Sequence, residues 1–185
     1  EPIKAINILF DGEAAEMNLK ALTASTIAGI MRRRNPDVNM VSAPVIAKDN
    51  GVQVSTTKQD QSGAFEGYIK VTVATDTRER SVAGTVFSDG KPRFIQIKGI
   101  NVDAEVGENM LYTTNKDIPG IIGKLGSILG DHGVNIANFT LGRSAAKGEA
   151  IALLYIDEPV PADAVKALEA SGNFQQVKPL TFVAI

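Results

Sequence analysis

The chain has 185 residues, of which 44% are hydrophobic, so it holds enough apolar material for one large or two small domains. Its 19 basic and 21 acidic residues leave a net charge of −2, which gives no electrostatic case for binding nucleic acid or an anionic membrane surface. It has no cysteine, which excludes a thiol nucleophile, disulfides and ligation of an iron–sulfur cluster by this chain and is typical of a cytoplasmic protein.

The first part of the chain predicts a mixed α+β domain over residues 1–106. Strands are expected at residues 3–10, 52–58, 68–75, 81–87 and 93–98, and helices at residues 13–34 and 41–50. The run Arg32–Arg34 falls in the last turn of the first helix, where its charge complements the helix dipole. Asp89-Gly90 predicts a tight turn, and Gly107 is expected to be the hinge to a second domain.

Residues 107–185 predict that second domain. Strands are expected at residues 110–115, 134–141, 149–156 and 174–183, and helices at residues 121–132 and 162–171. The order βαββαβ is the ferredoxin-like motif, an antiparallel sheet with both helices on one face. The open face and the sheet edges need a cover, and we expect pairing with a second copy of the chain to provide it.

Polar groups converge on the turn before the first helix of this domain. We expect Asp117 to be the N-cap, with Pro119 in the first turn, and Gly133 to end the helix just after His132. The helix amides near Gly120 suit a carboxylate, and the Asp117 carboxylate suits an ammonium. The amides of Asn115 and Asn135 suit either group.

The residues at this turn thus predict a binding site for a free amino acid. The competing interpretation is that Asp117 is a helix cap and Asn135 a turn residue, with no ligand.

Catalytic chemistry has little support in the sequence. His132 is the single histidine, and its place at a helix end predicts a capping role. We find no Ser/His/Asp set, no metal-ligand cluster and no G-x-G-x-x-G unit after a strand. We also find no apolar run of about 18 residues and no signal peptide. We therefore expect no catalytic residue, metal, cofactor or membrane span in this chain.

Two segments resemble a known family. The segment DIPGIIGKLGSILGDHGVNIANFTLGR resembles the start of an ACT domain, in the D-x-P-G…G-V-N-I-A form of D-3-phosphoglycerate dehydrogenases. Upstream, VNMVSAPVIAKDNGV is similar to the intervening domain of the same family, which commonly reads V-N-x-V-N-A-P-x-x-A-x-x-x-G. The two matches follow the family's order and together span nearly the whole chain.

The resemblance implies the C-terminal regulatory region of a long-form D-3-phosphoglycerate dehydrogenase. The parent enzyme would oxidise 3-phosphoglycerate with NAD, and its catalytic and NAD-binding domains lie outside this chain. Because the chain begins at Glu1 rather than Met, we expect it to be a piece of a longer protein.

The resemblance also implies an effector site. Family members that sense serine bind L-serine across a dimer interface, for feedback inhibition. The corresponding positions here are Asn115, Asp117, Ile118, Pro119, Gly120 and Asn135. Ile118 departs from the family, which commonly has Arg before P-G.

Some long-form members also bind an anion at the intervening domain. Arg93 matches a basic position of those members, and Lys91 lies close to it in sequence. Glu105 stands where some of them have Arg. Arg93 and Lys91 are therefore a second candidate site, against the alternative of exposed surface charge.

Two other functions stay open at this point. A bacterial L-serine dehydratase carries a related pair of domains, and its cluster ligands would lie elsewhere. A free-standing amino-acid-binding module is the third possibility. The residues upstream of Glu1 in the parent gene would distinguish them, since a G-x-G-x-x-G unit indicates a dehydrogenase.

Overall fold

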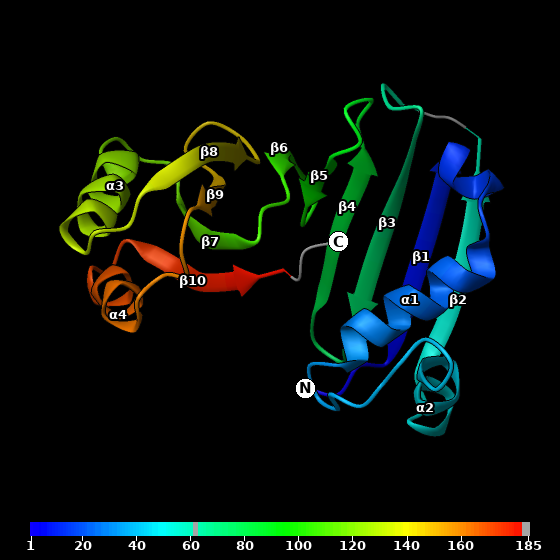
Figure 1. Ribbon diagram of the computed structural model, residues 1–185. Coiled ribbons are helices and arrows are strands. Elements are labelled where there is room, and N and C mark those ends of the chain that lie inside the picture. The colour runs from blue at the N-terminus through cyan, green and yellow to red at the C-terminus, as the bar shows by residue number, and fades with distance from the viewer. Residues whose placement is uncertain (61–62, 183–185) are drawn as a thin grey trace. The chain divides into compact units, whose positions relative to one another are not determined.

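The computed structural model describes residues 1–60 and 63–182, and it confirms the α+β class. The chain forms two compact units, Glu1–Val86 and Phe87–Ile185. Each unit contains β-strands and two α-helices (Figure 1).

The first unit contains four neighbouring strands covered by two helices. Its strands follow the order β2-β1-β3-β4, with β1 parallel to β2 and the other pairs antiparallel. The elements are β1 (Ala5–Gly12), α1 (Leu19–Met31), α2 (Ala43–Asp49), β2 (Gln53–Gln59), β3 (Gly67–Ala74) and β4 (Glu79–Val86). Apolar side chains of β1 pack against both helices and form the core, among them Ile6, Ile8, Phe10, Ile27 and Ala43.

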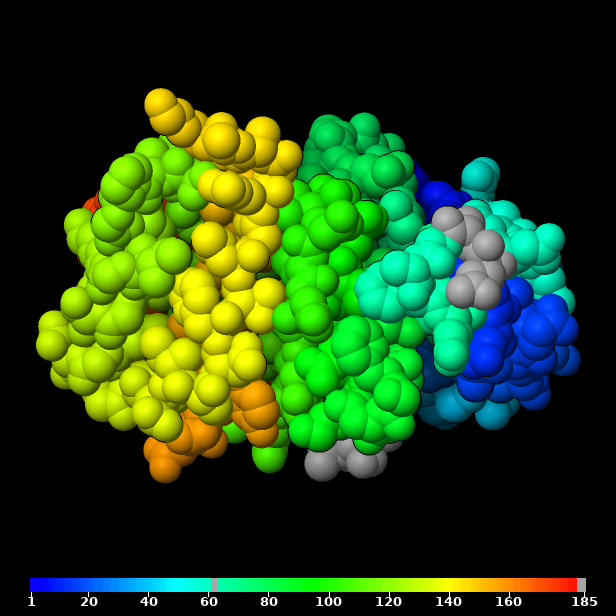
Figure 2. All heavy atoms as spheres, turned by 90° about the horizontal axis from the view of Figure 1, so that it is seen from above, coloured from blue at the N-terminus to red at the C-terminus, as the bar shows by residue number. Residues whose placement is uncertain are grey.

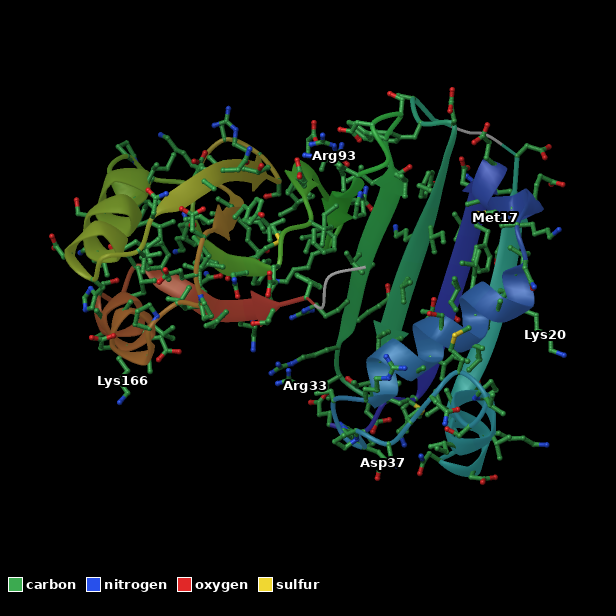
Figure 3. All side chains as sticks on the ribbon, viewed as in Figure 1. Met17, Lys20, Arg33, Asp37, Arg93 and Lys166 are labelled. Carbon is green, nitrogen blue, oxygen red and sulfur yellow. The ribbon has the colours of Figure 1, made fainter. Side chains whose placement is uncertain are left out.

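The helix predicted over residues 13–34 is two elements rather than one. A short 3-10 helix, Glu13–Glu16, comes first, and α1 begins after Asn18. The Oδ1 of Asn18 accepts the Ala21 backbone N–H at 3.2 Å and caps α1. The arginine run follows the end of α1 and does not lie in its last turn as predicted, because the helix ends at Met31; Figure 3 shows Arg33 pointing away from the helix.

The second unit contains the ferredoxin-like fold. Its antiparallel sheet has the order β10-β7-β9-β8, and α3 and α4 lie on one face. The elements are β7 (Asn109–Lys116), α3 (Ile121–Asp131), β8 (Ile136–Arg143), β9 (Glu149–Ile156), α4 (Ala162–Ala170) and β10 (Phe174–Thr181). Pro179 lies on the edge strand β10, as a proline in a strand should. The predicted last strand ran to Val183, which lies outside the described residues.

A hairpin of the second unit covers the other face of this sheet. Strands β5 (Pro92–Ile97) and β6 (Ile100–Glu105) pair antiparallel. Alternate apolar residues of β6 pack on apolar residues of the sheet, in a cluster made of Ile100, Val102, Ala104, Met110, Tyr112, Ile151 and Leu153. Figure 2 shows β8, in yellow, directly beside the green hairpin. The chain itself therefore covers the face for which we expected a second copy.

This packing explains why the units divide at a different place from the expected domains. The expected boundary was at residues 106/107, whereas the compact units meet at residues 86/87, because the hairpin packs with the second sheet. Gly107 is buried, and a Cβ there would lie 2.5 Å from ring atoms of Tyr155. Close packing against Tyr155 thus requires a glycine at this position, whether or not the residue acts as a hinge.

Replacing Gly142 with alanine is expected to destabilise the second unit. A Cβ at Gly142 of β8 would lie 2.6 Å from the backbone oxygen of Asn101 in the hairpin. Overpacking of this kind costs about 1–3 kcal/mol. Gly123 in α3 is the matched control, because a Cβ there meets nothing within 4 Å.

Gly123→Ala should stabilise the protein by about 0.5–1 kcal/mol, because alanine is the better helix former. Urea unfolding of both variants measures the difference. Equal free energies of unfolding for the two variants would contradict the docking of the hairpin against β8.

Candidate functional site

The residue that caps the start of α3 differs from the predicted one. The N-cap of α3 is Gly120, with a backbone φ of 87°, and no side chain caps the helix. Asp117 as the N-cap, with Pro119 in the first turn, was therefore wrong, because α3 begins at Ile121. The left-handed conformation of Gly120 makes the chain reversal directly before Ile121, which leaves Asp117 too far upstream to reach the helix amides.

The backbone of the turn offers fewer donors than expected. The N–H of Ile118 donates to the Lys116 carbonyl at 2.9 Å, and Pro119 has no N–H. Of the three predicted backbone positions, Gly120 alone retains an amide without a partner in the described residues. The other open donors belong to the first turn of α3, where the helix dipole favours an anion.

Asp117 holds the loop between β8 and β9 against the turn. Its Oδ2 accepts a hydrogen bond from Arg143 Nη1 at 3.0 Å and from the Lys147 backbone N–H at 3.3 Å. The Asp117 N–H donates to the Gly148 carbonyl at 2.9 Å. The Arg143 hydrogen bond, followed by that of Lys147, lowers the pKa of Asp117 below its ordinary value of 3.8. The carboxylate is therefore ionised at neutral pH and available to a cation.

Sequence reasoning missed Arg143 and Lys147. They lie 26 and 30 residues from Asp117 along the chain, and the pairing of β8 with β9 brings them to the turn. No local pattern signals a contact over that distance.

Asn115 lies at the same end of the sheet as Asp117. Asn115 is 3% exposed, and its Nδ2 donates to the Lys116 carbonyl at 2.7 Å. In the strand register both Asn115 and Arg143 face Ala150 of β9. The structure thus places Asn115, Asp117 and Arg143 at the same end of the sheet, where Asp117 contacts Arg143.

Asn135 lies at the opposite end. It directly precedes Ile136, which pairs with Ile156 at the far end of β9, and its Nδ2 donates to Asp157 Oδ2 at 2.5 Å. Six residues of β9 separate the positions Ala150 and Ile156, which is about 20 Å at roughly 3.4 Å per residue. Within one chain, Asn135 and Asp117 therefore do not form one site.

Exposed apolar side chains gather on the elements around Asp117. Among the described residues of the second unit, the large apolar side chains classed as exposed are Ile118 at 50%, Ile122 at 51% and Leu141 at 39%. They lie on the turn, on the first turn of α3 and near the end of β8. β8 is also the edge strand of its sheet. An open strand edge beside exposed apolar residues is typical of an interaction surface.

Replacing Asp117 with asparagine should remove part of the acid sensitivity of folding. Because the pKa of Asp117 is lowered in the folded protein, its ionised form stabilises the fold above the ordinary value of 3.8. That stabilisation is lost as the pH falls through the folded pKa. In urea unfolding, the difference in free energy between wild type and variant should be constant above about pH 5 and shrink below it. A difference that persists to the lowest pH would contradict the Asp117–Arg143 interaction.

Comparison with known proteins identifies both parts of the chain. Residues 1–98 match the D-3-phosphoglycerate dehydrogenase intervening domain, and residues 110–173 match the ACT domain. The chain belongs to the D-3-phosphoglycerate dehydrogenase family. The sequence resemblance is thereby confirmed over both domains.

Individual members of the D-3-phosphoglycerate dehydrogenase family match most of this chain. The enzyme of Synechocystis sp. is 32% identical over 86% of the chain and 29% of its own length. The enzyme of Bacillus subtilis is 30% identical over 96% of the chain and 34% of its own length, and that of Methanocaldococcus jannaschii is 27% identical over 95% and 33%. The chain thus spans about a third of these curated relatives.

The second candidate site, at Arg93 and Lys91, has internal partners for both cations. Lys91 Nζ lies 2.9 Å from Glu105 Oε1. The guanidinium of Arg93 lies 3.2 Å from Asp89 Oδ2 and 3.8 Å from Asp103 Oδ1. Two cations and three carboxylates give the cluster, labelled by Arg93 in Figure 3, a net charge of −1. The anion site stays a prediction for this family member, and an anion would compete there with the carboxylates.

His132 caps α3 as predicted. It is the C-cap residue, and its ring Nδ1 donates to the Ile128 carbonyl at 2.8 Å. Over residues 1–60 and 63–182 we find no group of three or more His, Cys, Asp or Glu placed to hold a metal ion. Within the same residues, no helix has the length and apolar character that crossing a membrane requires.

Proposed function

We propose that this chain is the regulatory part of a cytoplasmic D-3-phosphoglycerate dehydrogenase and that it binds L-serine between the ACT domains of two copies. The family membership and the names of its relatives support the parent activity, which belongs to L-serine biosynthesis. The NAD-binding and catalytic domains would lie in the two thirds of the enzyme that this chain does not span. This fragment would then be the sensor and would carry out no dehydrogenation itself.

The separation of Asp117 from Asn135 is the observation that carries the proposal. Both positions match the family's effector site, yet they lie at opposite ends of one sheet. β8 is an edge strand, and two β8 strands that pair antiparallel about a twofold axis bring the start of one strand beside the end of the other. Asn135 of one chain then comes close to Asp117 of its partner, and the pair forms two equivalent sites.

The chemistry of the paired site suits L-serine. The ammonium group meets the ionised Asp117 carboxylate. The side-chain amides of Asn115 and Asn135 each already donate one hydrogen bond within the chain, and their remaining N–H and oxygen supply a donor and an acceptor for the polar groups of the ligand. The exposed apolar residues Ile118, Ile122 and Leu141 become buried as the two domains meet. Their burial favours association.

Regulation follows from a difference in affinity between two arrangements. L-serine binds the arrangement in which two ACT domains are paired, so it shifts the population toward that arrangement. The first unit transmits this preference to the catalytic domains. Coupling of this kind amounts to about 1–3 kcal/mol, which changes the affinity for a second ligand about 5- to 150-fold.

Sedimentation and calorimetry of this chain test the proposal together. We expect at least a dimer at micromolar concentration and saturable binding of L-serine, with one site per chain. A chain that sediments as a monomer at all accessible concentrations, with and without L-serine, would contradict the proposal. Dimerisation without binding of any amino acid would contradict the sensor function alone.

A further inference from the structure

We infer that Arg143 binds the carboxylate of the effector, so that the Asp117–Arg143 ion pair acts as a template for a zwitterion. The inference rests on the proposed function and adds a residue that determines specificity. The two side chains pair at 3.0 Å. A bound α-amino acid enters between them, with its ammonium at Asp117 and its carboxylate at Arg143. Each charge of the protein thereby exchanges one partner for another of the same sign.

The hydrogen-bond donors at the turn point to Arg143 as the partner of the ligand carboxylate. The carboxylate of the ligand needs donors, yet the Ile118 N–H is already used and Pro119 has none, so the turn offers the Gly120 amide and the neutral amides of the first turn of α3. Arg143 is the guanidinium nearest to the ammonium partner, since it touches the Asp117 carboxylate. A guanidinium presents several donors in a planar fork that matches a carboxylate, and such charge-assisted bonds are stronger than bonds from neutral amides.

Arg143 is also free to make this exchange. Its side chain is 59% exposed, against 23% for that of Asp117. Its Nη1 bonds to Asp117, while its Nη2 and Nε have no hydrogen-bond partner in the described residues. The residue is the last of β8, so its backbone is fixed while its side chain is not packed in a core. The guanidinium can therefore turn to a ligand without disturbing the sheet.

This arrangement selects ligands that carry both charges. A ligand with an ammonium group alone would take Asp117 from Arg143 and give Arg143 nothing in return. A ligand with a carboxylate alone would do the same to Asp117. Each case leaves one charge without its partner, whereas an α-amino acid satisfies both. The geometry thus favours zwitterionic amino acids over amines and hydroxy acids of the same size.

The test compares three ligands on two variants by calorimetry. L-serine carries both charges, L-serinamide lacks the carboxylate, and 3-hydroxypropanoate lacks the ammonium. Arg143→Gln removes the guanidinium and is expected to fold, because Arg143 is exposed. Lys166→Gln is the matched control, since it removes one positive charge from α4, where Lys166 lies on the outer side of the helix (Figure 3).

In the wild type and in Lys166→Gln we expect L-serine to bind at least about tenfold more tightly than either analogue. In Arg143→Gln the affinity for L-serine should fall about ten- to a hundredfold, the range of one charge-assisted hydrogen bond. The affinity for L-serinamide should not fall, so the preference for L-serine over L-serinamide should nearly vanish.

Each of the other outcomes has a distinct meaning. Unchanged L-serine binding in Arg143→Gln would overturn the inference and leave the proposed function standing. An equal loss of L-serine and L-serinamide would also overturn it, because a structural role of Arg143 affects both ligands alike. If the wild type binds none of the three ligands and no other amino acid, the proposed function fails, and the inference fails with it.

Discussion

Replacing Asp117 with alanine is expected to weaken L-serine binding at least about tenfold while the protein stays folded. The Asp117 carboxylate is an anionic side chain at the proposed site, and with a pKa that the Arg143 hydrogen bond lowers below the ordinary 3.8 it is ionised at neutral pH. A charge-assisted hydrogen bond to the ammonium group of the ligand is lost in the variant, and such a bond typically accounts for a tenfold or larger change in affinity.

The fold should survive this change because Asp117 is not the cap of α3. Its side chain contacts Arg143, whose side chain is 59% exposed, and the Lys147 backbone N–H, and exposed ion pairs stabilise proteins little. Calorimetric titration with L-serine measures the affinity, and a thermal melt checks the fold. Asp131→Ala is the control, since it removes the same charge from the other end of α3. Equal affinities of the two variants would place the ammonium site elsewhere.

The sequence predicted α3 well because its signals are local. Ile121, Leu125 and Leu129 recur at helical spacing, and all three are buried. Gly133 ends the helix with a φ of 71°, a conformation that glycine adopts readily. The start of the helix was predicted less well, because Asp117 and Gly120 both precede it and propensity alone does not decide which residue makes the turn.

The sequence did not predict which sheet the strand β6 packs against. The alternation of Ile100, Val102 and Ala104 does predict a strand with one apolar face. It does not say which sheet that face covers, because the contact joins residues that are distant in sequence. The hairpin packs on the second sheet, so it covers the face for which we expected a second copy, and the compact units divide before the hairpin.

The candidate site also has a part that local sequence signals predict and a part that depends on the folded sheet. Asn115, Asp117 and Asn135 are polar residues at turns and strand ends, and such residues can be selected from the sequence. The role of Arg143 depends on the pairing of β8 with β9 and on the loop between them. The separation of Asn135 from Asp117 depends on the strand register, which is read from the folded sheet.

Mixing two variants with weakened sites is expected to restore tight L-serine binding. In the proposed dimer each site takes Asp117 from one chain and Asn135 from the other. Asp117→Ala and Asn135→Ala should each weaken both sites of their own homodimer. In a mixed dimer one site carries both substitutions, while the other combines the intact Asp117 of one chain with the intact Asn135 of the other. That site should bind as the wild type does.

Complementation between these two variants is the most direct test of a site shared by two chains. The variants are unfolded together, refolded in equal amounts and titrated with L-serine, alongside each variant treated alone. Random pairing gives half mixed dimers, so we expect about one wild-type site per four chains. Neither variant alone should show such a site. A mixture that binds no better than its two components would contradict an effector site formed between two copies of this chain.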